Sequence, residues 1–73
     1  MNGWTNYETW HVAATIGNYE NLYRIAKRSS SYSNFVKRMS QFGLQSTPDG
    51  VKYSSKKVKR KELTSLIKSF KEV

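Results

Sequence analysis

The sequence contains no cysteine, a single histidine, a single proline and four glycines. The absence of cysteine excludes disulfides, thiolate zinc sites and cysteine nucleophiles, and it fits a reducing compartment. The glycines stand singly along the chain, which excludes a glycine-rich phosphate loop. One histidine and five scattered carboxylates show no metal-ligand spacing. We therefore expect neither a metal nor a cofactor.

Long apolar runs are also lacking. No stretch approaches the roughly 20 apolar residues of a membrane-spanning helix, and the first residues, Met1-Asn2-Gly3-Trp4, lack the charged and apolar regions of a signal peptide. These absences predict a cytoplasmic protein without a membrane partner. A chain of 73 residues buries only about 60% of the surface of its unfolded state. We expect one domain, residues 1–73, with a marginal stability that a homodimer would increase.

Lysine, arginine and aromatic residues, by contrast, are abundant. Thirteen Lys and Arg against five Asp and Glu give a net charge of +8. Residues 51–73 hold eight basic and two acidic side chains, a net +6, whereas residues 1–50 hold five and three, a net +2. Two Trp, five Tyr and three Phe supply much of the apolar area that a core needs. The concentration of positive charge indicates a polyanion or an acidic protein as partner.

Caps and helical periodicity predict an all-α protein, a compact bundle of about four short helices. The first helix begins at Thr5, with Glu8 completing a capping box, and ends near Ile16. Gly17 then supplies a left-handed residue, and Asn18 caps a second, amphipathic helix. The two helices are expected to form a corner.

The second half of the chain contains two further predicted helices. The serine run 29–31 ends in a cap for the third helix, which closes at Gly43 with Leu44 folded back in a Schellman motif. A turn and a short extended segment over residues 46–53 precede the last helix, which is expected to begin between residues 55 and 58. The apolar stripes are Tyr32, Phe35, Val36, Met39 and Phe42 on the third helix, and Leu63, Leu66, Ile67, Phe70 and Val73 on the last.

The first predicted helix has apolar residues on most of its surface, with Glu8, His11 and Thr15 as a polar strip. A helix of this kind is normally central, so we predict that it lies in the middle of the bundle with Trp10 in the core. Glu8 and His11 would support proton transfer if they lay in a cleft. Their ordinary interpretation is an exposed pair on the helix surface. We predict no catalytic residues and a protein that is not an enzyme.

Residues 2–10 read Asn-Gly-Trp-Thr-Asn-Tyr-Glu-Thr-Trp. They resemble an Asn-Gly-Trp-x-Asn-x-Glu-Thr-Trp motif of a family of small uncharacterised proteins of phages and bacteria, cyanophages included. Residues 47–51 and Glu62-Leu63 resemble the family more loosely, and the C-terminal part, more acidic in longer relatives, is basic here. The resemblance implies a phage origin, and hence the cytoplasm of a host cell, but no known activity.

The motif has a structural and a functional interpretation. Its capping and packing residues suffice to explain it as the start of a helix. Alternatively, Trp4, Tyr7 and His11 form an exposed aromatic interface on which a base or a partner side chain stacks, with Tyr23 of the second helix as a further interface residue.

The densest positive charge runs from residue 56 to residue 61 and continues on the outer face of the last helix. Such a stripe binds phosphates without sequence specificity, although a merely solvated face is the simple alternative. We predict a phage-type accessory or regulatory protein that engages nucleic acid through its basic C-terminal helix. The alternative is a modulator, an inhibitor or adaptor, of an acidic host protein. The candidate polyanion-binding residues are Lys56, Lys57, Lys59, Arg60, Lys61, Lys68 and Lys71.

Overall fold

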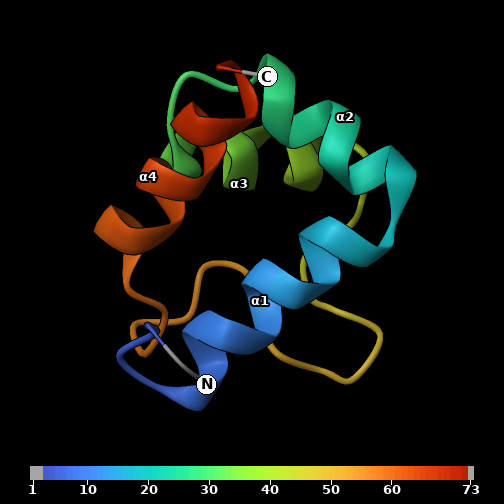
Figure 1. Cartoon of the computed structure of the whole chain (residues 1–73). Coiled ribbons are helices and arrows are strands. Elements are labelled where there is room, and N and C mark those ends of the chain that lie inside the picture. Colours follow the sequence, from blue (N-terminus) through green and yellow to red (C-terminus); the bar gives the residue numbers. More distant parts are fainter. Residues whose placement is uncertain (1–2, 73) are drawn as a thin grey trace.

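The computed structural model describes residues 3–72, which form four helices (Figure 1). The all-α fold predicted from the sequence is confirmed, and within the described residues strand pairing is limited to one antiparallel bridge, between Ser46 and Lys52. This bridge closes the predicted turn. The helices are α1 (Tyr7–Asn18), α2 (Glu20–Arg28), α3 (Tyr32–Gln41) and α4 (Arg60–Phe70).

Helix α1 begins after an asparagine cap. The Asn6 Oδ1 atom accepts a hydrogen bond from the backbone N–H of Thr9 at 2.9 Å, so Asn6 is the N-cap. The predicted capping box of Thr5 and Glu8 is therefore wrong. The hydroxyl and backbone N–H of Thr5 donate instead to Glu62 of α4, a contact that local sequence spacing does not reveal.

The corner between α1 and α2 is made by one extended residue. Tyr19, at φ −114° and ψ 116°, ends α1 and serves as the N-cap of α2 without a side-chain cap bond. Gly17 lies inside α1 with a negative φ, so the predicted left-handed glycine and the predicted Asn18 cap are both wrong. A single extended residue changes the chain direction here, which removes the need for a left-handed one.

Both ends of α3 follow the local sequence. Ser31 caps the helix by accepting the N–H of Asn34 at 3.2 Å. At the other end Gly43 has φ +76°, its N–H donates to the Ser40 carbonyl, and the N–H of Leu44 donates to the Met39 carbonyl, both at 2.9 Å. This is the predicted Schellman closure. Phe42, predicted on the apolar face, is 67% exposed because the helix has ended at the preceding residue.

The segment between α3 and α4 contributes to the core although it is not helical. Tyr53 and Val58 are buried, and the Tyr32 hydroxyl donates to the Tyr53 carbonyl. The last helix begins at Arg60 rather than between residues 55 and 58. Val73, predicted on its apolar stripe, lies outside the described residues. The backbone N–H of Lys59 bonds the Thr9 side chain instead of a preceding carbonyl, which holds this stretch in turns until α4 starts.

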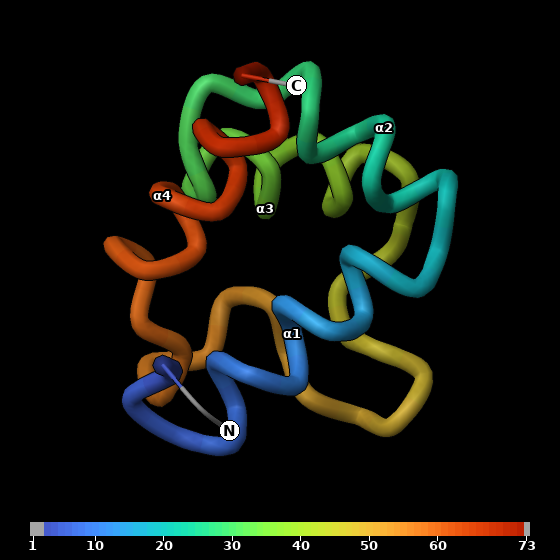
Figure 2. Tube along the Cα trace, viewed as in Figure 1, coloured from blue at the N-terminus to red at the C-terminus, as the bar shows by residue number. Residues whose placement is uncertain are grey.

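The core lies where α2 and α4 each pack against the other three helices, while α1 packs against α2 and α4. The prediction that α1 is central with Trp10 in the core is wrong, because Trp10 is 36% and Tyr7 48% exposed. The path of the chain in Figure 2 brings the start of α1 beside the segment that leads into α4. The buried apolar residues are Val12, Ala13, Ile16, Leu22, Ala26, Tyr32, Phe35, Met39, Tyr53, Val58, Leu63 and Ile67.

Candidate functional site

The basic segment, defined here as residues 56–61, is an exposed surface with a fixed backbone. The Asn6 Nδ2 atom donates to the Lys57 carbonyl at 2.7 Å, and the Lys59 N–H donates to the Thr9 hydroxyl at 2.9 Å. Both partners belong to the first turn of α1 and its cap. These two bonds hold the segment against α1, and its charged side chains are exposed.

The acidic side chain next to this segment is hydrogen-bonded to Thr5 rather than to a lysine. The two carboxylate oxygens of Glu62 accept the N–H of Thr5 at 3.0 Å and its hydroxyl at 2.6 Å. Within residues 3–72 the carboxylates that lie within 4 Å of a basic nitrogen are Glu20, beside Arg24, and Asp49, beside the His11 ring, so none of the seven predicted phosphate-binding cations is paired with a carboxylate there. The basic segment holds five cations against the single charge of Glu62 beside it, so the local potential stays positive.

Arg60 differs from the lysines around it. Its Nη1 atom donates to the Ser33 hydroxyl at 2.9 Å, and its guanidinium carbon lies 5.7 Å from the centre of the Tyr32 ring. These contacts fasten the start of α4 to the start of α3 and stabilise the fold. Arg60 thus has a structural role in addition to its exposed charge.

The basic segment continues along one side of α4 with Lys61 and Lys68 and, at the C-cap, with Lys71. At roughly 100° per residue, Lys61 and Lys68 point in directions about 20° apart, and Lys71 lies within about 80° of Lys61. Lys68 is displaced by roughly 10 Å along the helix axis from Lys61. All three side chains are exposed. The structure thus arranges these predicted cations as a stripe rather than as a compact pocket.

An aromatic cluster lies on the outer side of α1. The ring of Tyr7 stacks on that of His11 with centroids 5.5 Å apart, and the ring of Trp10 lies 5.8 Å from Tyr7 and 6.5 Å from His11. Tyr7 and Trp10 are exposed, whereas His11 is only 8% exposed. Of the predicted aromatic interface, the structure brings Tyr7 and His11 together and adds Trp10, which helical periodicity had assigned to the core.

The other two predicted interface residues lie elsewhere. Trp4 is half-buried and packs against the core. Tyr23 is half-buried on α2, with its ring edge-on to Phe70 of α4 at 4.6 Å. Both side chains hold elements together, so the exposed aromatic cluster consists of Tyr7 and Trp10 supported by His11.

His11 holds the loop of residues 46–50 against α1. Its Nε2 atom lies 2.9 Å from the Thr47 hydroxyl and 3.7 Å from an Asp49 carboxylate oxygen. The predicted exposed pair of Glu8 and His11 is wrong, because the loop covers the polar strip of α1 and buries His11 and Thr15. Both contacts of His11 use the same nitrogen, whereas a catalytic triad uses the two ring nitrogens for different partners.

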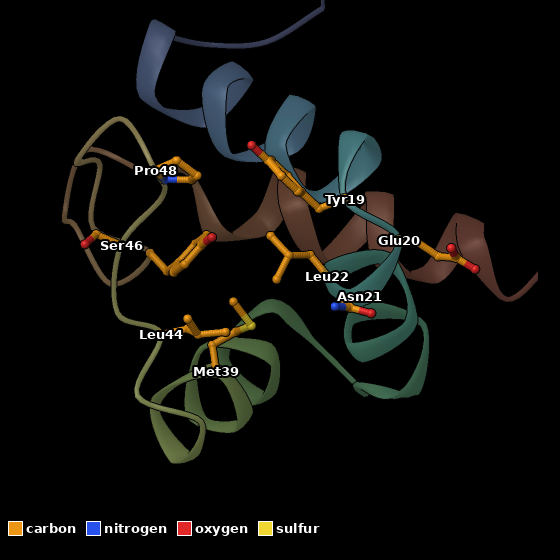
Figure 3. Close-up of a pocket in the computed structure, with 9 residues that line it drawn as sticks. Tyr19, Glu20, Asn21, Leu22, Met39, Leu44, Ser46 and Pro48 are labelled. Carbon is orange, nitrogen blue, oxygen red and sulfur yellow. The ribbon is translucent and has the colours of Figure 1, made fainter.

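An apolar groove of about 570 Å³ opens between α2, α3 and the segment that follows α3 (Figure 3). Leu22 of α2, Met39 of α3 and Leu44 of the following segment point into it, with Tyr19 and Pro48 at its rim. Burial, and to a lesser extent the neighbouring Tyr19, raise the pKa of Tyr53, which also lines the groove. The groove was not predicted, because its walls come from three segments that only the fold brings together.

The described part of the chain places no three His, Asp or Glu side chains where they could hold a metal ion, and it contains no helix long and apolar enough to cross a bilayer. The family model that matches covers residues 1–72. The chain belongs to a family of unknown function, DUF7249. No curated protein and no solved structure matches it. For this DUF7249 member, the geometry described above is therefore the basis for a functional proposal.

Proposed function

We propose that this protein binds nucleic acid through the basic segment and the lysine stripe of α4, in an accessory or regulatory role of the kind found among phage proteins. The observation that carries the proposal is the fixed backbone of residues 56–61, whose lysines are exposed and unpaired with carboxylates in the described structure. Lysines held in this way neutralise phosphates and release counterions, which is the main source of non-specific affinity.

The side chain of Glu62 supports the same interpretation. A carboxylate beside four lysines would normally offset part of their attraction for phosphate. Here Glu62 keeps its charge but accepts its two hydrogen bonds from Thr5 and forms no ion pair with a lysine in the described structure. The lysine side chains remain available for an anionic partner.

A charge-matched pair of variants tests the proposal. One variant carries Gln in place of Lys56, Lys57, Lys59 and Lys61, and the control carries Gln in place of Lys27, Arg28, Lys37 and Arg38 on α2 and α3, so each has four positive charges fewer than the natural +8. Arg60 stays unchanged in both, because it holds α3 and α4 together. Circular dichroism confirms that each variant keeps its helical content.

Binding to an oligonucleotide is measured between about 50 and 200 mM salt. The natural protein should bind with a steep salt dependence. The variant of the basic segment should lose at least about tenfold in affinity and reduce the salt slope by about 3, since each lost phosphate contact contributes roughly 0.7 to 0.9. The control should change much less. Equal losses in both variants, or no binding by the natural protein at about 50 mM salt, would overturn the proposal.

A second candidate function rests on the apolar groove. The exposed side chain of Leu44 lines it, and the chain as a whole is strongly basic, so a suitable occupant is an amphipathic segment of an acidic protein. An acidic amphipathic model peptide should then shift the NMR methyl signals of Leu22, Met39 and Leu44, and Leu44→Glu should abolish the shifts. Shifts confined to lysine side chains would exclude this candidate.

A further inference from the structure

We propose that the bound nucleic acid is single-stranded and that one of its unpaired bases stacks on Trp10 in a small pocket beside that ring. This inference rests on the proposed nucleic-acid binding and adds the form of the ligand and the place of its base. The starting observation is that Tyr7 and Trp10 have neighbouring, exposed rings in a protein that has few apolar residues to form its core. Exposed aromatic rings beside a basic surface are typical of single-strand binding.

The pocket lies between α1 and the loop that His11 holds. Trp10, Ala14 and Asn18, spaced four residues apart, form one wall, and Pro48 and Asp49 of the loop form the other. The small side chain of Ala14 leaves the space open. Its volume of about 270 Å³ is just below the roughly 300 to 1,000 Å³ of pockets for drug-sized ligands, which suits a single flat base.

The position of the pocket relative to the lysines completes the argument. Asn6 and Thr9, which bond the backbone of Lys57 and Lys59, immediately precede Tyr7 and Trp10 in α1. The basic segment therefore lies against the same end of α1 that carries Tyr7 and Trp10, and a strand bound to these lysines has the rings within reach of its next nucleotides. In a duplex the bases are paired and stacked inside, and they cannot reach a ring on the protein surface. The geometry therefore favours a single strand over a duplex.

The polar rim of the pocket indicates which bases fit. The Asp49 side chain is 76% exposed, and one of its oxygens lies 3.7 Å from His11 Nε2, so the carboxylate can still accept hydrogen bonds from a ligand. A carboxylate accepts from the exocyclic amino group of cytosine, adenine or guanine, whereas thymine and uracil lack this group. We expect stronger binding of oligo(dC) or oligo(dA) than of oligo(dT), and Asp49→Asn should reduce this difference.

The experiment uses the intrinsic fluorescence of Trp10. Trp4→Phe leaves Trp10 as the one tryptophan, because the sequence contains two. Fluorescence should change on titration with oligo(dC) and stay nearly constant with a duplex of the same length. Trp10→Ala should lower the affinity for the single strand about tenfold or more while changing duplex affinity less than about twofold. Phe42→Ala, which removes an exposed ring elsewhere, is the matched control and should change neither affinity.

A second variant tests the pocket without removing the indole, in case Trp10→Ala loses structure. Ala14→Leu keeps the indole and a good helix former but fills the pocket. It should lower single-strand affinity and suppress the fluorescence change. If natural protein binds single strand and duplex equally and neither variant alters this, the base pocket is disproved while nucleic-acid binding stands. If no nucleic acid binds but an arginine-rich peptide quenches Trp10, both proposals fail, and the pocket is a cation site.

Discussion

Glu62 of α4 accepts two hydrogen bonds from Thr5, a residue 57 positions earlier in the chain. The Thr5 N–H lies 3.0 Å from one carboxylate oxygen and the Thr5 hydroxyl 2.6 Å from the other. The pair joins the first described turn to the last helix.

Replacing Glu62 tests its contribution to stability. Glu62→Ala removes both acceptors and should lower the free energy of unfolding by about 1 kcal/mol, a value typical of partly exposed charged hydrogen bonds. Glu72→Ala is the control, because it deletes an exposed carboxylate at the end of the same helix with the same change in charge. Urea denaturation followed by circular dichroism measures both. Equal stabilities of the two variants would show that the Thr5 contact contributes nothing.

Asn6 combines two roles that substitution can separate. Asn6→Asp keeps the cap of α1 but loses the donor to the Lys57 carbonyl, whereas Asn6→Ala loses both bonds. We expect Asn6→Ala to cost about 2 kcal/mol and Asn6→Asp about half of that. The measurement is thermal unfolding of both variants beside the natural protein. If the aspartate variant were as stable as the natural protein, the hydrogen bond to the Lys57 carbonyl would contribute nothing to stability.

Replacing each of two glycines by alanine should change the stability of the protein in opposite directions. Gly43 has φ +76°, and a Cβ added there would meet no atom within 4 Å, so Gly43→Ala should cost about 1 kcal/mol through backbone strain alone. Gly17 lies in α1 with open space around it, and Gly17→Ala should stabilise the protein by about 0.5 kcal/mol or more. Chemical denaturation measures the change in the free energy of unfolding of both variants. Changes of the same sign in the two variants would contradict this account of the α3 closure.

Burial raises the pKa of Tyr32 well above its ordinary value of 10.0, although the nearby Arg60 guanidinium opposes the shift. Above pH 10 the unfolded chain releases this phenol proton while the folded chain retains it, so raising the pH favours unfolding by up to about 1.4 kcal/mol per unit. Below pH 10 the contribution is fully present. Tyr32→Phe should be about 1 kcal/mol less stable at neutral pH, because the Tyr53 carbonyl loses its donor.

The pH dependence is measured by denaturation between about pH 8 and 12, the range around the ordinary tyrosine pKa. The difference in stability between the natural protein and Tyr32→Phe should shrink as the pH rises through that range. Lysine deprotonation affects both proteins alike and cancels in the comparison. A difference that stays constant up to the end of the range would show that Tyr32 titrates at the same pH in both states.

The sequence by itself determined the helical class, the serine cap of α3 and its glycine closure. These features depend on hydrogen bonds between residues at most five positions apart, such as Leu44 to Met39 and Asn34 to Ser31. Local residue types therefore suffice to predict them. The basic segment was predictable as well, since charge is a property of composition.

Only the tertiary structure decided which side of α1 faces solvent, where α4 begins and what lies beside the lysines. Each depends on a partner far away in the sequence: His11 bonds Thr47 across 36 positions, and Lys59 bonds Thr9 across 50. Helical periodicity shows which residues share a face, but not which face a distant loop will cover. That loop buried the polar strip of α1 and left Trp10 exposed at the edge of the proposed base pocket.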